Sequence, residues 1–171
     1  ARGKMTAANV FVPNRGEVLD IFGKRFFMYS GAYSVDYMYR RADVSIFHEE
    51  LAYVEEAEKI RARLKTTGQV DYIISHDGPL SITSLIMGFK LSARLPEGYY
   101  RTLGISGQKL HAGLFLEELL NSGLSYENWF FGHHHRDVQL GKLRCLFNDI
   151  VIHDLSSGKI SEIKQAAADA H

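Results

Sequence analysis

The chain has 171 residues, of which 46% are hydrophobic, so we expect a single domain over residues 1–171 that needs neither disulfides nor a structural metal. The 20 lysine and arginine residues balance the 20 aspartate and glutamate residues without long runs of like charge, which gives no sign of a nucleic-acid surface or a membrane-binding patch. One cysteine, Cys145, rules out an internal disulfide. Because neither a signal peptide nor an apolar run of roughly 20 residues is found, we expect a cytoplasmic protein.

The N-terminal part has the pattern of a β-hairpin. Runs rich in β-branched and aromatic residues predict strands at Val10 to Val12, Glu17 to Phe22 and Arg25 to Ser30, with Gly23-Lys24 as the tight turn between the last two. The next segment, Gly31 to Arg41, is too polar and aromatic for a plain turn, and loops of this kind often carry function.

The centre of the chain alternates helix and strand, as is typical of an α/β protein. Apolar residues at helical spacing predict an amphipathic helix over Phe47 to Lys65. A buried strand over Val70 to Ser75 follows and runs directly into His76 and Asp77. In open α/β sheets ligands bind beyond the carboxyl ends of the strands, which is where these two polar residues should lie.

The second half of the chain contains the remaining predicted elements. Lys90 to Ser106 has no assignable pattern. A second buried strand, Asn128 to Phe131, ends in Gly132 and three consecutive histidines, so it repeats the placement of His76. The other expected elements are a short helix over Ser81 to Phe89, an amphipathic helix over Gly107 to Asn121, and a final strand pair, Lys142 to Phe147 with Asp149 to Leu155, ahead of a polar tail.

Four of the eight histidines, His76, His133, His134 and His135, should therefore lie just beyond two parallel strands. Neutral imidazole is a common ligand of zinc, iron and manganese, and two histidines one residue apart in a loop can reach neighbouring positions of a metal cluster. The pattern predicts a divalent-metal site. Two plainer interpretations stay open, namely a solvated histidine loop and a hydrogen-bonded structural role for His76.

Gly132-His133-His134-His135 resembles the Gly-His-x-His motif that closes the active site of calcineurin-like metallophosphoesterases, and Asp71 to His76 resembles the strand-and-histidine motif upstream of it. Segments between Arg15 and Arg40 resemble the stretch that follows the Gly-Asn-His motif in bacterial members, so the resemblance runs from about Gly3 to about Ile160. It implies a four-layer α/β/β/α sandwich with mixed sheets. It also implies metal-dependent hydrolysis of a phosphorylated substrate, by a phosphoprotein phosphatase-like monoesterase or a phosphodiesterase.

The resemblance also implies roles for the histidines. In that family two divalent ions share a bridging hydroxide that attacks phosphorus, and manganese, iron or zinc would suit such a site. Carried over by position, His76 and His133 would bind one metal ion and His135 the other. His134 occupies the variable position of the motif, where it is either solvent-exposed or catalytic through contact with the substrate.

Asp36 and Arg40 match recurring residues of the bacterial subgroup. The resemblance makes both of them substrate-binding residues, and Arg40 would act as a catalytic residue by orienting a phosphate, since a guanidinium fork suits phosphate oxygens. The alternative for this pair is a purely structural salt bridge.

The family's opening motifs are missing. Asp-x-His, Gly-Asp-x-x-Asp and Gly-Asn-His supply its other metal ligands, and none of them stands ahead of His76. The remaining histidines are too few for a dinuclear cluster, so we expect partial or no metal occupancy and little activity from the chain by itself. We therefore expect the C-terminal part of a metallophosphoesterase domain, incomplete at its N-terminal side. The missing segment or a homo-oligomer partner should then cover an exposed sheet edge.

Two alternatives remain open. One is a natural short protein that keeps the scaffold as a catalytically inactive interaction module. The other is a mononuclear metal site for a different reaction, built from His133 and His135 with His76 or Asp77 as the third ligand.

Overall fold

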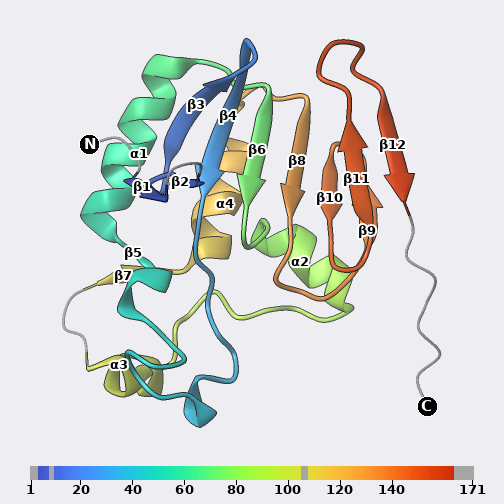
Figure 1. The fold of residues 1–171 in the computed structure, drawn as a ribbon. Coiled ribbons are helices and arrows are strands. Elements are labelled where there is room, and N and C mark those ends of the chain that lie inside the picture. The colour runs from blue at the N-terminus through green and yellow to red at the C-terminus, as the bar shows by residue number, and fades with distance from the viewer. Residues whose placement is uncertain (1–3, 8–9, 105–107, 164–171) are drawn as a thin grey trace.

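The computed structural model describes residues 4–7, 10–104 and 108–163, and its centre is a six-stranded mixed sheet (Figure 1). The four inner strands run parallel to one another, and each edge strand is antiparallel to its neighbour. In spatial order the strands are β3 (Glu17–Ile21), β4 (Lys24–Tyr29), β6 (Tyr72–Ser75), β8 (Asn128–Phe131), β10 (Leu143–Cys145) and β9 (Val138–Leu140). The predicted α/β class is confirmed.

Two helices, α1 (Val54–Thr67) and α4 (Ala112–Asn121), cover one face of this sheet. Side chains alternate between the two faces along each strand, so residues in register form rows across the sheet. One buried row packs against the apolar sides of both helices and consists of Phe27, Ile73, Trp129 and Leu143. Because each buried side chain of this size stabilises the fold by roughly 1.5–3 kcal/mol, this contact is the main support of the sheet.

A β-hairpin lies over part of the opposite face. It consists of β11 (Ile150–His153) and β12 (Ile160–Ile163), which are antiparallel. The ring of His153 contacts the ring of Tyr72 edge-on, with centroids 5.0 Å apart. Arg144 of β10 forms ion pairs with Asp149 and Glu162, so charged contacts as well as ring contacts attach the hairpin to the sheet.

A smaller core lies beyond the carboxyl ends of the parallel strands (Figure 1). Ile46, Leu51, Tyr99 and Leu103 are buried together there. The elements around it are the 3-10 turns Tyr37–Tyr39 and His48–Glu50, α3 (Glu97–Leu103), and the antiparallel pair β5 (Ala52–Tyr53) and β7 (Lys109–Leu110). The remaining elements are α2 (Leu80–Met87), which follows β6, and the antiparallel pair β1 (Lys4–Ala7) and β2 (Val10–Val12).

The predictions for the central α/β part are confirmed. The expected hairpin before Gly31 is β3 with β4, and the strands expected at Val70 to Ser75 and Asn128 to Phe131 are the parallel neighbours β6 and β8. The short helix expected over Ser81 to Phe89 is α2. Within the described residues, no helix combines the length and the apolar character needed to cross a membrane.

Both long helices begin later than predicted. The helix expected from Phe47 begins at Val54, because Leu51 and Tyr53 have extended backbone angles and β5 pairs with β7. The same pairing delays α4 to Ala112, and residue 107, where that helix was expected to begin, lies outside the described residues. The unassigned segment 90–106 contains α3, and its last two residues are likewise not described.

The predicted final strand pair is wrong. β10 pairs with β8 and β9, whereas β11 pairs with β12, whose residues were expected to be a polar tail. The carboxylate of Asp137 accepts the backbone N–H groups of Phe147, Asn148 and Asp149. This turn separates β10 from β11, so the two cannot form the expected hairpin.

Candidate functional site

Backbone hydrogen bonds bring the ends of three parallel strands together. The N–H of His76 donates to the carbonyl of Tyr29 at 3.0 Å, and the N–H of Gly132 donates to the carbonyl of His76 at 3.1 Å. The loops that follow β6 and β8 therefore start side by side. This is the end of an α/β sheet at which ligands bind, and both histidine motifs begin there.

The rings of His76 and His133 are neighbours, with centroids 5.0 Å apart. The Nε2 atom of His133 lies 3.2 Å from the carbonyl oxygen of Tyr33. A carbonyl can only accept, so Nε2 carries the proton and Nδ1 keeps its lone pair. Burial lowers the pKa of His133, which favours this neutral form. The arrangement matches the way metal-binding histidines are oriented by a hydrogen bond from their second nitrogen.

His134 is not solvent-exposed, which excludes one of the two roles expected for it. Its side chain is 11% exposed, and its Nε2 donates to Oδ1 of Asp77 at 2.8 Å. Asp77 is buried and also accepts the backbone N–H of Gly78 at 2.7 Å. The carboxylate of Asp77 therefore holds the imidazole of His134 in a fixed orientation.

His135 turns away from the pair formed by His76 and His133. Its ring stacks on Phe147, with centroids 4.6 Å apart. Both His133 and His135 have positive φ angles, of 69° and 51°. Such backbone conformations cost side-chain-bearing residues on the order of 1 kcal/mol and cluster at functional sites, so the loop is held in a strained shape by its surroundings.

Asp36 and Arg40 form the salt bridge that was the structural alternative for them. Nε of Arg40 donates to Asp36 at 2.8 Å, and a second guanidinium nitrogen lies 2.7 Å from the same carboxylate. The hydrogen bond to Arg40 lowers the pKa of Asp36, and the reverse contact raises the pKa of Arg40. A third guanidinium nitrogen donates to the carbonyl of Ser45, so much of this group is already occupied.

His111 is a site residue that sequence reasoning missed. It is the N-cap of α4, where its Nδ1 accepts the backbone N–H of Gly113 at 3.1 Å. It is 7% exposed, and burial lowers its pKa. Its position gave no signal, because it fell inside the helix expected over Gly107 to Asn121 and histidine is not among the residues preferred at an N-cap.

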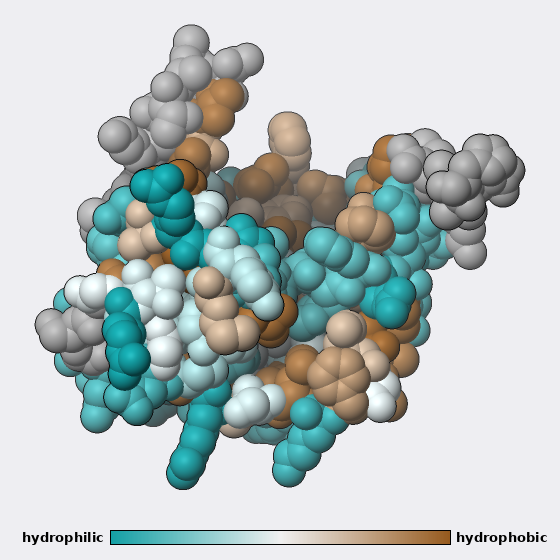
Figure 2. Space-filling view, turned by 90° about the horizontal axis from the view of Figure 1, so that it is seen from below, coloured by the Kyte–Doolittle hydropathy of each residue, from teal (hydrophilic) through white to brown (hydrophobic). Residues whose placement is uncertain are grey.

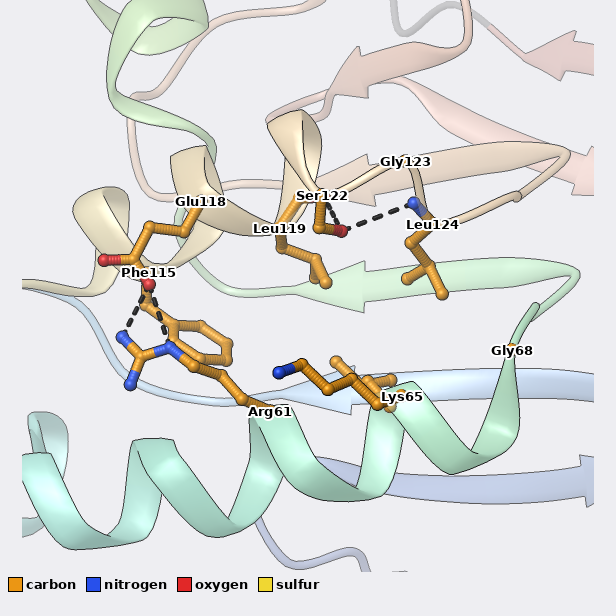
Figure 3. Close-up of a pocket in the computed structure, with 10 residues that line it drawn as sticks. Arg61, Lys65, Gly68, Phe115, Glu118, Leu119, Ser122, Gly123 and Leu124 are labelled. Atoms are coloured by element: carbon orange, nitrogen blue, oxygen red, sulfur yellow. Dashed lines mark hydrogen bonds and ion pairs between the residues drawn. The ribbon is translucent and has the colours of Figure 1, made fainter.

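A cavity of about 640 Å³ lies beyond the carboxyl ends of the strands. Its lining includes Asp36, Arg40, His111, His133, His134 and His135. His76 lies outside it and lines a separate cavity of about 270 Å³. A further cavity, of about 290 Å³, lies between α1 and α4 and contains no histidine (Figure 3). There Arg61 donates to Glu118 at 3.0 Å and lies over the ring of Phe115. Its guanidinium is thus already paired, and we place the candidate site at the histidine-lined cavity.

The described residues offer only part of the ligand set that the expected metal ion would need. His76 and His133 are adjacent, and His133 has a free Nδ1 lone pair. Across residues 4–7, 10–104 and 108–163, however, no group of three His, Cys, Asp or Glu side chains is arranged to hold a metal ion. A complete site would need further ligands.

Compared with models of known families, with curated proteins and with solved structures, the chain matches none of them.

Proposed function

We propose that the chain carries the later part of the active site of a metal-dependent phosphoester hydrolase. The observation that carries the proposal is the adjacency of His76 and His133, which follow two neighbouring parallel strands and are far apart in sequence. Their meeting at the ligand-binding end of the sheet, beside a large cavity lined by apolar side chains and a few charged and imidazole groups, supports a site that binds an ion and a substrate.

In this proposal divalent metal ions, when bound, would neutralise charge on the phosphate and supply the nucleophile. The chain's own residues orient the side chains at the site. The carbonyl of Tyr33 fixes the ring of His133, and Asp77 fixes the ring of His134 at the substrate space. Asp36 and the carbonyl of Ser45 hold Arg40 at the cavity, so a phosphate there would meet a guanidinium that is fixed in place and already partly paired.

The four-layer sandwich belongs to the same proposal. The face of the sheet opposite α1 and α4 carries half-buried apolar side chains next to the β11–β12 hairpin, namely Phe26, Met28, Ile74 and Phe130. Hydrophobic surface also lines a recess in the upper half of the view along the ends of the strands (Figure 2). We propose that a second sheet, from a preceding segment or a second copy, packs against this face and brings the remaining metal ligands.

The second candidate is a catalytically inactive interaction module. It is favoured by one observation, that the described residues contain no three-ligand group. The two candidates differ in their metal content. A module should purify without stoichiometric metal and lose nothing on chelation, whereas the hydrolase should lose its activity to a chelator and recover it with manganese.

The deciding experiment uses protein expressed from the complete reading frame that encodes this chain. Hydrolysis of p-nitrophenyl phosphate is measured with and without Mn²⁺ for the unaltered protein, for His133→Ala and for His48→Ala. His48 is the matched control, because its imidazole contacts Glu49 and does not line the cavity. The proposal expects Mn²⁺-dependent turnover that falls at least about tenfold in His133→Ala and is unchanged in the control. Equal rates in all three proteins would refute it.

A further inference from the structure

The proton on His111 has a fixed position. Its Nδ1 accepts the backbone N–H of Gly113 at 3.1 Å, and a peptide N–H can only donate. Nδ1 is therefore deprotonated. In a neutral imidazole the proton must then be on Nε2, so His111 presents an N–H donor at its other end.

That donor is uncommitted. Among the residues that the structure describes, none forms a hydrogen bond with Nε2 of His111. The side chain is nevertheless 7% exposed and lines the large cavity, and Nε2 is not one of the buried nitrogens sealed away from solvent. An N–H without a protein partner, on a residue that lines a cavity, is suited to a ligand that accepts its hydrogen bond.

Several donors around this cavity are already used. The imidazole of His134 donates to Asp77, Arg40 donates to Asp36, and the hydroxyl of Ser34 donates to Glu50. His111 lies against the ring of Tyr33, with centroids 5.6 Å apart, and the carbonyl of Tyr33 holds His133. Tyr33 thus contacts both His111 and His133, which links the residue with the free N–H to one member of the proposed metal-binding pair.

We propose that His111 is a substrate-binding residue whose Nε2–H donates a hydrogen bond to a phosphoryl oxygen. This inference rests on the proposed hydrolase function and adds a residue to its site. His111 differs in kind from His76 and His133, because with Nδ1 occupied and Nε2 protonated it has no lone pair to offer a metal. A neutral donor binds an oxyanion without adding a positive charge that would repel the ions.

The test is the binding of inorganic phosphate in the presence of Mn²⁺. His111→Ser keeps a good N-cap for α4 but removes the N–H that reaches the cavity, so the fold should be retained. Loss of a hydrogen bond to a charged group should weaken phosphate binding by roughly tenfold to a hundredfold. His48→Ser removes a histidine that does not line the cavity and should bind phosphate like the unaltered protein.

Nitrogen-15 NMR of the metal-free protein gives a readout that does not depend on activity. The inference expects His111 to be protonated on Nε2 alone. Finding the proton on Nδ1, or equal phosphate affinity in the unaltered protein and His111→Ser, overturns it while leaving the hydrolase proposal standing. Failure of the unaltered protein to bind phosphate with Mn²⁺ present would instead refute the hydrolase proposal, and the role of His111 with it.

Discussion

Replacing Gly31 by alanine should destabilise the protein by roughly 2–4 kcal/mol, as the sum of backbone strain of about 1 kcal/mol and overpacking of about 1–3 kcal/mol. Gly31 has a φ of +91°, which a side-chain-bearing residue adopts only with strain. A Cβ at this position would also meet the backbone of Glu50, with the carbonyl carbon only 2.8 Å away and the carbonyl oxygen closer still. Backbone cannot rotate aside as a side chain can, so the segments around residues 31 and 50 would have to separate.

Gly23→Ala is the matched control. Gly23 has a similar φ of +76°, but an added Cβ there would have no neighbour within 4 Å, so the expected cost is strain alone, about 1 kcal/mol. Equilibrium urea unfolding can be followed through Trp129, the one tryptophan, which is fully buried. With a slope of about 2 kcal/mol per molar urea, the midpoint of Gly31→Ala should fall roughly 0.5–1.5 M below that of Gly23→Ala. Equal midpoints would show that the contact of the added Cβ with the Glu50 backbone does not lower the free energy of unfolding.

Two further predictions concern the buried polar groups beneath the site. Burial lowers the folded-state pKa of both His111 and His133. Below the ordinary histidine pKa of 6.5 the unfolded chain therefore binds more protons than the folded one. The free energy of unfolding should fall as the pH drops through about 6.5, and it should be level above that pH. Urea midpoints across this range check the sign, and greater stability on acidification would contradict it. Ser75→Ala should cost roughly 1–3 kcal/mol, because the Ser75 hydroxyl accepts from Trp129 Nε1 at 2.8 Å and donates to the Asp77 carbonyl at 2.6 Å. Unfolding midpoints like those of the unaltered protein would mean that Trp129 finds another acceptor.

The parallel strands could be predicted because each is a short apolar run followed by polar residues. β6 and β8 show this pattern, and their parallel pairing followed from the helices expected between them. Local pattern failed where pairing with a distant segment decided the structure. The two-residue strand β5 pairs with β7, which is far away in sequence. The apolar spacing around Leu51 fits a helix and does not indicate this pairing.

The C-terminal strands were mispredicted for a similar reason. β10 lies in the sheet beside β8, and the turn held by Asp137 then moves the chain to the other face. Alternation of apolar residues identifies a strand but not its partner, so the sequence predicts a pairing of two neighbouring strands that the structure does not form. The partner of β11 is β12, which was too polar to be recognised.

The candidate site was partly predictable. The motifs placed His76 and His133 on neighbouring strand ends, and the structure makes their rings neighbours. What could not be foreseen were the partners that fix the imidazoles, because they depend on long-range contacts. Asp77 is 57 residues from His134 in sequence, and the carbonyl that orients His133 belongs to a loop 100 residues away.

The most direct test of the central claim is a Zn²⁺ titration of the 171-residue chain, observed through the imidazole resonances of His76 and His133. Because the two rings are adjacent and His133 has a free Nδ1, both resonances should shift together with one apparent affinity. Replacing either histidine should abolish the shift of the other. Independent titration of the two residues, or a shift of one that persists without its neighbour, would contradict the claim that they share an ion.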